Sequence, residues 1–338
     1  TNGWNIMSFN VVPDTTDMEN IFQGLISEGS LVKIQNEGGD AMEYVSIFGG
    51  YWKNNIGDMK TTEGYYTKVN GNTSLTLSGL PAELPLDITL TDGWNIISYP
   101  GQNAQAAVEI NCDDYDTNGY CDINGGILKS LIDDGLLVKV QNESGDAIKY
   151  FESWNYWSDD IGNFEPGEGY YVKVELESSS STVTLTIDEG TTLVRMKDEK
   201  PEKMEPIHYH PDFVGNPYLP MNLYIVDVVI DGAPALPGME IGIFDNGVCV
   251  GSAMIEETIE SKTDFLSIPV GMDDPTTNQR DGYLPGNHID VRIWTGEKEH
   301  EVNHSNWVFE AQGTTIMELD VRTIPDNYRL HANYPNPF

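Results

Sequence analysis

The chain has 338 residues, of which 54 are acidic and 18 are basic, so its formal net charge is −36. This excess of acid argues against binding to nucleic acid or to an anionic membrane surface, because both partners require clustered cations. No apolar run is long enough to span a membrane, and the absence of a signal peptide is what we expect of a mature exported chain. Hydrophobic residues make up 39% of the sequence, which is enough for folded cores.

An internal repeat organises the N-terminal half of the sequence. Three segments return at offsets of 90, 106 and 105 residues (91 − 1, 137 − 31 and 168 − 63): TNGWNI at 1–6 as TDGWNI at 91–96, LVKIQNE at 31–37 as LVKVQNE at 137–143, and EGYY at 63–66 as EGYY at 168–171. The second copy therefore has 16 additional residues (106 − 90) between its first strand and its helix. We predict two tandem repeats, at 1–85 and 91–190, with an insertion at about 107–124.

Each copy predicts the same elements in the same order. A strand on Trp-Asn-Ile is followed by a short helix, because one helical face is apolar and a glycine stops it. These residues are Ile21, Phe22, Leu25, Ile26 and Gly29 in the first copy, and Ile127, Leu128, Leu131, Ile132 and Gly135 in the second. Strands on Leu-Val-Lys and on Gly-Tyr-Tyr come next, and a Ser/Thr-rich strand closes each unit.

A charged linker at 191–206 leads to a third domain at 207–322. Asp245-Asn246-Gly247 predicts a tight hairpin turn between two apolar strands. Further strands are expected at 265–270, 288–294, 306–310 and 315–321. The predicted fold class is mainly β: two tandem small β-rich repeats, each with one short helix, followed by an immunoglobulin-like or jelly-roll-like β-sandwich.

The end of the chain carries a recognisable motif. Residues 324–330 (IPDNYRL) and 333–338 (NYPNPF) resemble the start of a type A C-terminal sorting domain of the type IX secretion system, so residues 323–338 are assigned to such a segment. The resemblance implies export across the outer membrane of a Bacteroidetes-type bacterium, then release or anchoring at the cell surface. The alternative is an ordinary proline-rich turn. The tandem repeats resemble Gly-Trp-Asn…Gly-Tyr-Tyr repeats of secreted bacterial surface proteins, and residues 238–251 resemble a β-domain that often precedes type IX sorting domains.

The insertion in the second repeat predicts a calcium site. Its oxygen ligands recur with the spacing of the first part of a calcium loop: Asp114, Asp116, Asn118, the carbonyl of Tyr120, and Asp122. Position 12 of the loop is Gly125 rather than Glu, so the pattern is closer to thrombospondin-type and dockerin-type repeats than to a full EF-hand.

We expect a disulfide between Cys112 and Cys121 to staple this loop, and Cys249 to be a reduced, buried strand residue. The alternative for the loop is a solvated acidic turn held only by the disulfide.

Three weaker patterns favour structural roles. The acidic segment 273–282 has irregular ligand spacing, so an inter-strand loop is favoured over a second ion site. The string HEVNH at 300–304 matches a zinc-protease motif that works only on a helix, whereas the flanking residues alternate as in strands. His208 and His210 have no third ligand nearby in the sequence, which favours a domain-boundary strand.

Aromatic residues recur at equivalent repeat positions: Tyr51, Trp52, Tyr65 and Tyr66, with Tyr156, Trp157, Tyr170 and Tyr171. This recurrence favours a role in the cores. The alternative is a sugar-stacking surface, for which Trp52, Trp154 and Trp157 are the candidates.

Taken together, these features predict a non-enzymatic, secreted, cell-surface or extracellular structural or adhesive protein, such as a spacer, matrix or filament component. No Ser-His-Asp, Cys-His or phosphate-binding arrangement stands out. Expected partners are other copies of the chain or other surface and matrix proteins, with glycans as a further class. The alternative is a carbohydrate-binding accessory region of a larger secreted hydrolase.

Overall fold

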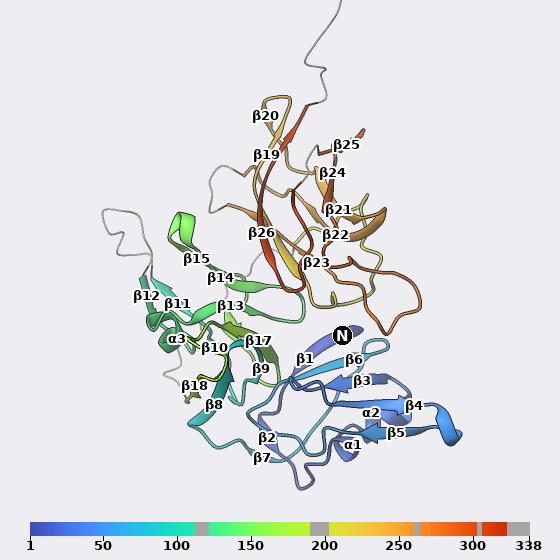
Figure 1. Ribbon diagram of the computed structural model, residues 1–338, viewed down its shortest axis with the longest axis vertical. Coiled ribbons are helices and arrows are strands. Elements are labelled where there is room, and N and C mark those ends of the chain that lie inside the picture. Colours follow the sequence, from blue (N-terminus) through green and yellow to red (C-terminus); the bar gives the residue numbers. More distant parts are fainter. Residues whose placement is uncertain (112–121, 190–202, 260–263, 303–305, 323–338) are drawn as a thin grey trace, which may run out of the picture. The chain divides into compact units, whose positions relative to one another are not determined.

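The computed structural model describes residues 1–111, 122–189, 203–259, 264–302 and 306–322 (Figure 1). Within these residues the protein is mainly β, as predicted. It has three short α-helices where one per repeat was predicted, because the helix of repeat 1 is interrupted at Phe22. The chain divides into two compact units: an N-terminal unit, Thr1–Glu202 with Phe213–Leu219, and a C-terminal unit, Lys203–Asp212 with Pro220–Phe338. The assignment of 213–219 to the N-terminal unit differs from the domain boundary predicted at residue 207.

The two repeats contain antiparallel five-stranded sheets with the same strand order (Figure 1). In repeat 1 the order is β1 (Gly3–Met7), β6 (Tyr65–Val69), β3 (Leu31–Gln35), β4 (Ala41–Val45) and β5 (Tyr51–Asn54). In repeat 2 it is β9 (Gly93–Ser98), β17 (Gly169–Val174), β13 (Leu137–Gln141), β14 (Ala147–Phe151) and β15 (Tyr156–Asp159). The repeat predicted from the sequence is thus a repeat of structure.

Helices and smaller sheets complete both repeats. The helices are α1 (Met18–Ile21), α2 (Gln23–Glu28) and α3 (Lys129–Asp133), and two 3-10 turns are η1 (Ile47–Gly49) and η2 (Glu152–Trp154). Two-stranded sheets pair β2 (Val11–Val12) with β7 (Leu80–Pro81), β10 (Gln105–Ala106) with β16 (Asn163–Phe164), β11 (Glu109–Asn111) with β12 (Asp122–Gly125), and β8 (Leu86–Thr91) with β18 (Thr182–Ile187). The prediction of a closing Ser/Thr-rich strand is therefore correct for repeat 2. It is wrong for repeat 1, where residues 73–78 form no strand and no described segment pairs with them.

A single asparagine side chain shapes the start of each repeat. In repeat 2, Asn95 Oδ1 accepts the N–H of Thr91 at 2.8 Å, and Nδ2 donates to the carbonyl oxygens of Thr91 and Gly93 at 2.9 and 3.2 Å. Asn5 makes the same bonds to Thr1 and Gly3 in repeat 1. The backbone bend before each first strand, here called the asparagine corner, requires a positive φ at its glycine. The values are +90° at Gly3 and +95° at Gly93, which only glycine adopts without strain. These contacts explain why Thr-x-Gly-Trp-Asn recurs.

Each repeat has its own hydrophobic core. The first tyrosine of EGYY, Tyr65 or Tyr170, is fully buried in that core, and its hydroxyl accepts the N–H of Lys60 or Glu165 at 2.8 Å. The prediction that these aromatics belong to the cores is confirmed for both residues.

The repeats join through two equivalent strand contacts. Met7 of β1 forms a bridge with Glu168, and Ile97 of β9 forms one with Glu63. Ile97 is the repeat-2 counterpart of Met7 and Glu168 is the counterpart of Glu63, so the two contacts are related by a local pseudo-two-fold axis. The N–H of Ser8 donates to the carbonyl oxygen of Gly167 at 2.8 Å.

The glycine of EGYY allows this close approach. A Cβ on Gly64 would lie 2.5 Å from the carbonyl oxygen of Ile97, and one on Gly169 would lie 2.9 Å from Ile6 Cγ2. The second tyrosine of the motif, Tyr66 or Tyr171, packs in a shared cluster that the repeats build together with Trp4, Ile6 and Ile96. EGYY therefore serves the repeat interface as well as each core.

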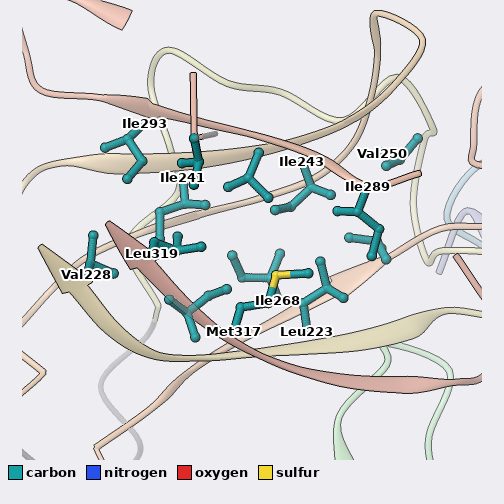
Figure 2. Close-up of a cluster of buried hydrophobic side chains, with 14 of the residues drawn as sticks. Leu223, Val228, Ile241, Ile243, Val250, Ile268, Ile289, Ile293, Met317 and Leu319 are labelled. Atoms are coloured by element: carbon teal, nitrogen blue, oxygen red, sulfur yellow. The ribbon is translucent and has the colours of Figure 1, made fainter. Parts of the chain in front are cut away.

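The C-terminal unit consists of two four-stranded sheets around one core. One contains β19 (Met221–Ile230), β20 (Ala233–Pro234), β23 (Leu266–Val270) and β26 (Thr314–Val321); the other contains β21 (Glu240–Asp245), β22 (Val248–Met254), β24 (Asp290–Trp294) and β25 (Glu299–Glu301). Figure 2 shows side chains of both sheets, including Leu223, Met317, Ile241 and Ile293, meeting in that core. β19 and β26 pair in parallel, and every other pairing is antiparallel among the described strands of this unit.

The predicted hairpin turn is confirmed. Asn246 and Gly247 have φ values of 50° and 88°, as a tight two-residue turn between β21 and β22 requires. The strand predicted at 306–310 is wrong: only a single bridge joins Val308 to His288. The N–H of Phe309 donates to the carbonyl oxygen of Asn287, and the N–H of Ile289 donates to that of Trp307.

The asparagine corner yields a test of this account. Asn95 is buried, so Asn95→Ala leaves several backbone groups without a partner, and we expect it to lower the free energy of unfolding of the N-terminal unit by about 2–4 kcal/mol. Asn5 is only half-buried, so Asn5→Ala should cost about 1 kcal/mol, since water replaces part of the lost bonding. Urea denaturation of both variants measures the difference. Equal, small effects would contradict the role assigned to the corner.

Candidate functional site

The insertion that carries the predicted calcium ligands begins and ends in a hairpin of repeat 2. Strands β11 and β12 pair with Asn111 opposite Asp122, the residues that flank the two cysteines in the sequence. Residues 112–121 lie outside the described residues, and so does the side chain of Asp122. The calcium ligands and the Cys112–Cys121 disulfide therefore stay predictions.

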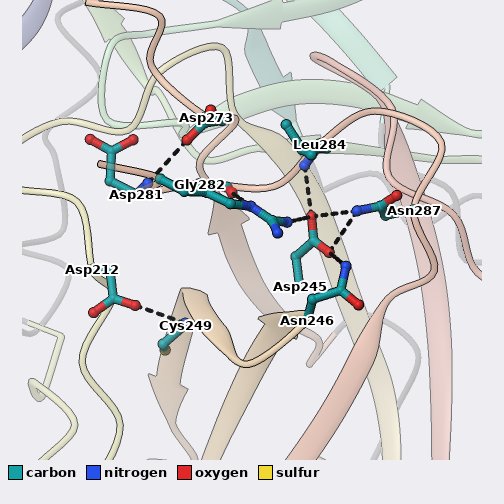
Figure 3. Close-up of polar contacts among 10 residues, drawn as sticks. Asp212, Asp245, Asn246, Cys249, Asp273, Asp281, Gly282, Leu284 and Asn287 are labelled. Atoms are coloured by element: carbon teal, nitrogen blue, oxygen red, sulfur yellow. Dashed lines mark hydrogen bonds and ion pairs between the residues drawn. The ribbon is translucent and has the colours of Figure 1, made fainter. Parts of the chain in front are cut away.

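The second acidic segment, 273–282, is held together by its own carboxylates (Figure 3). Asp273 Oδ1 accepts the N–H of Asp281 at 3.0 Å, and Asp281 Oδ1 accepts that of Asp274 at 3.1 Å. Within the described chain, no group of three or more His, Cys, Asp or Glu residues is arranged to hold a metal ion. The acids of this loop order its backbone, which fits the inter-strand loop favoured from the sequence.

A buried carboxylate anchors that loop to the hairpin turn. The side chain of Asp245 is 0% exposed and forms an ion pair with Arg280. It also accepts hydrogen bonds from the N–H of Leu284 at 2.7 Å and from Asn287 Nδ2 at 2.8 Å (Figure 3). The charge of Asp245 is thus satisfied, as a buried carboxylate requires.

The histidine patterns have structural roles where they are described. His300 and Glu301 lie on strand β25, so they lack the helical spacing of a zinc protease, and His304 lies outside the described residues. His208 stacks on Trp294 with ring centroids 3.9 Å apart. The strand predicted there is wrong: the segment is irregular, because buried Glu240 accepts its consecutive N–H groups at Ile207, His208 and Tyr209.

Cys249 is unpaired and buried in strand β22, as predicted. Burial raises the pKa of its thiol to about 11, so the thiolate form is disfavoured at neutral pH. Its N–H donates to Asp212 Oδ2 at 3.2 Å (Figure 3).

Aromatic pairs sit on the outermost hairpin of each repeat. Tyr44 lies directly opposite Trp52 across β4 and β5, and Tyr150 lies opposite Trp157 across β14 and β15. The ring centroids are 6.1 and 5.3 Å apart. Both tryptophans also pack against the core of their repeat, so the prediction of a core role holds in part. The side chain of Trp154, the third stacking candidate, is not described.

The hairpin of repeat 1 exposes apolar surface. Tyr44, Ile47 and Tyr51 are 56%, 57% and 47% exposed. The prediction that Tyr51 belongs to the core is therefore wrong, because β5 is the edge strand of its sheet. Tyr44 and Tyr150 were not predicted as surface residues, although their recurrence 106 residues apart (150 − 44) was a signal in the sequence.

Two equivalent glutamates line the repeat interface. Glu37 Oε2 accepts the N–H of Ile96 at 2.8 Å. Its counterpart Glu143 has a buried Oε2 for which the structure shows no hydrogen-bond partner. Burial, with the nearby charges of Glu168 and Asp146, raises the pKa of Glu143 to about 7, against the smaller lowering effects of a backbone hydrogen bond and the Thr1 amino group.

Comparison with protein-family models and with curated proteins finds no match to this chain. None of the helices in the described chain has the length and apolar character needed to cross a membrane.

Glu143 predicts a pH dependence of stability. The folded state holds the proton of Glu143 up to about pH 7, whereas the unfolded chain releases it near 4.5, so this group's contribution to stability falls as pH rises between those values. The shift corresponds to about 3 kcal/mol. Glu143→Gln should therefore raise the unfolding free energy at pH 8 and flatten its decline above pH 5.

Denaturation at several pH values measures this effect. Glu175→Gln, which changes an exposed acid of the same repeat, is the control and should leave the pH dependence unchanged. A Glu143→Gln variant with the pH profile of the parent protein would show that the buried carboxyl does not titrate as stated.

Proposed function

We propose that this chain is a secreted, cell-surface or extracellular structural or adhesive protein, not an enzyme, that meets partner chains through its repeats. The pseudo-two-fold joint carries the proposal. The joint between the two repeats is formed at β1 and β9, which are one edge strand of each sheet. The opposite edge strands, β5 and β15, have no further strand partner among the described residues. A tandem pair of sheets with two equivalent outward edges is suited to a spacer, matrix or filament component.

The exposed hairpin of repeat 1 supports docking of another protein. Unpaired edge strands present backbone donors and acceptors to other chains, and apolar side chains beside them add contact area. Tyr44, Ile47 and Tyr51 supply such area around β5. Partners would be other copies of the chain or other surface and matrix proteins.

Localisation and domain type belong to the same proposal. The C-terminal motif at 324–338, which resembles a type IX sorting segment, supports export to the cell surface. The two sheets with a shared core support an immunoglobulin-like or jelly-roll-like sandwich for the C-terminal unit.

We expect Ca²⁺ to promote assembly in two ways, by ordering the insertion and by screening the acidic faces that repel one another. The net charge of −36 opposes association at low ionic strength, where like charges repel over more than about 10 Å. A Ca²⁺ ion held by Asp114, Asp116, Asn118, Tyr120 and Asp122 would order the insertion, and further divalent ions would screen acidic faces.

A calcium series tests the proposal. We expect light scattering and electron microscopy to show larger assemblies as Ca²⁺ and moderate salt are added, and native mass spectrometry to show one tightly held ion per chain. A hundredfold excess over the dissociation constant should stabilise repeat 2 by about 2.7 kcal/mol. Asp116→Ala should abolish the tight site, whereas Asp133→Ala, an exposed acid outside the insertion, should not. A chain that stays monomeric and binds neither cells nor matrix under all conditions would contradict the proposal.

Carbohydrate binding is the second candidate function, and the Tyr–Trp pairs favour it. Aromatic rings beside hydrogen-bonding groups stack on sugars, and Tyr150 donates its hydroxyl to Asn155 at the end of the repeat-2 hairpin. If this function holds, isothermal titration with oligosaccharides should give micromolar to millimolar binding. Trp157→Ala and Trp52→Ala should each remove one of two sites, while Leu80→Ala, an exposed apolar control, should change nothing. Saturable sugar binding without assembly would favour this candidate over the first.

A further inference from the structure

The 213–219 segment of the chain lies along the first strand of repeat 1. Asn216 forms a parallel bridge with Gly3, and its Nδ2 donates to the carbonyl oxygen of Trp4 at 2.8 Å and to Thr1 Oγ1 at 3.0 Å. The Tyr218 ring contacts the rings of Trp4 and Tyr66, with centroids 5.3 and 5.9 Å away. This segment thus adds one bridge and an aromatic anchor to the outer edge of β1.

Small residues make the contact close. A Cβ on Gly3 would lie 3.0 Å from the carbonyl oxygen of Val214 and 3.2 Å from the nitrogen of Asn216. A Cβ on Gly215 would collide with the carbonyl oxygen of Asn2. The segment therefore needs glycine before its asparagine, and the acceptor edge needs glycine before its tryptophan.

Repeat 2 contains the same acceptor edge. Gly93 and Trp94 pair with Val174 and Lys173 in the register that Gly3 and Trp4 have with Val69 and Lys68, so the carbonyl oxygen of Trp94 points away from its sheet as that of Trp4 does. The corner before it is also the same: Asp92 Oδ1 accepts the N–H of Leu176 at 2.9 Å, as Asn2 Oδ1 accepts that of Gly71 at 2.7 Å. Lys173 and Lys68 lie over the equivalent tryptophan rings at 5.7 and 5.8 Å.

The two edges differ in their occupant and in the packing of the tryptophan: Trp4 stacks on Tyr66 with ring centroids 4.3 Å apart, whereas Trp94 meets Tyr171 edge-on at 6.0 Å. A Cβ on Gly93 would meet no atom within 4 Å, in contrast to the crowded Gly3. Gly3 and Trp4 are buried, whereas Gly93 and Trp94 are half-buried. The described residues contain one such segment and two such edges, so within that part of the chain the segment fills the Gly3 edge and nothing lies against the Gly93 edge.

We propose that the Gly93–Trp94 edge is an acceptor site for a short segment of a partner polypeptide, with a glycine, then an asparagine, and an aromatic residue two positions after the asparagine. The occupied edge of repeat 1 defines this chemistry, because 215–218 (GNPY) shows which side chains the edge recognises. The asparagine amide would reach the carbonyl oxygen of Trp94, and the aromatic ring would lie against the Trp94 ring. This inference deepens the proposed role in meeting partner chains and rests on it.

A synthetic peptide tests the site on the intact chain. We expect an end-blocked peptide of residues 213–220 to bind with a stoichiometry of one, measured by isothermal titration and by loss of hydrogen exchange at the amides of repeat 2. Replacing its asparagine by alanine removes two hydrogen bonds and should weaken binding roughly tenfold. A scrambled peptide is the control for non-specific binding.

Matched glycine variants locate the bound peptide. Gly93→Ala places a methyl group where the peptide backbone would lie and should abolish binding, whereas Gly3→Ala makes the same change at the edge that is already filled and should leave binding intact. Circular dichroism confirms that both variants fold, and Trp94→Leu provides a second test of the same edge without a change at a positive-φ position.

Binding that survives both Gly93→Ala and Trp94→Leu, or that is lost only in Gly3→Ala, would show exchange with the chain's own segment and overturn the proposal. Absence of peptide binding would overturn it as well. Neither result would bear on calcium-dependent assembly, which the light-scattering series measures separately.

Discussion

The side-chain amide of one asparagine in each repeat, Asn5 or Asn95, organises the N-terminal unit. By bonding to the backbone on both sides of a positive-φ glycine, it fixes the direction in which β1 or β9 leaves its corner. One edge of that strand then pairs with its own sheet. The outer edge of β1 or β9 contacts the neighbouring repeat at its C-terminal end, through Met7 or Ile97. At its N-terminal end the same edge carries the acceptor position, Gly3 or Gly93. The repeat interface and the Gly3 and Gly93 edges both depend on this geometry.

Several of the acidic side chains have structural roles. Glu240 accepts three consecutive N–H groups, Asp245 pairs with Arg280, and Glu37 bonds across the repeat interface. A buried carboxylate is tolerated when donors of this kind surround it. Glu143 departs from the pattern. Its repeat-1 counterpart sits near Glu63, which is paired with Lys60, whereas Glu165 occupies the position of that lysine in repeat 2.

Duplication followed by divergence explains how the repeats differ. Both retain the asparagine corner, the buried Tyr65 or Tyr170, and an aromatic pair on the outer hairpin. They differ in the insertion before α3 and in the 213–219 segment, which forms its bridge with β1 of repeat 1. The shared features build each sheet and join the two. The differing features supply the candidate ion site and the candidate acceptor edge, whereas the outer edges and the aromatic pairs are common to both repeats.

The sequence alone determined the mainly β fold, the two repeats, the glycine stops at Gly29 and Gly135 and the Asn246-Gly247 hairpin, because each depends on local periodicity or on glycine and asparagine in tight turns. It also located Cys249 in a buried strand. Only the tertiary structure decided which aromatics are core and which are surface: Tyr65 and Tyr51 are alike in sequence, yet one lies in a central strand and the other in an edge strand. The same holds for the EGYY glycines and for the 213–219 segment. Their roles arise from contacts between residues far apart in the chain, which no local pattern encodes.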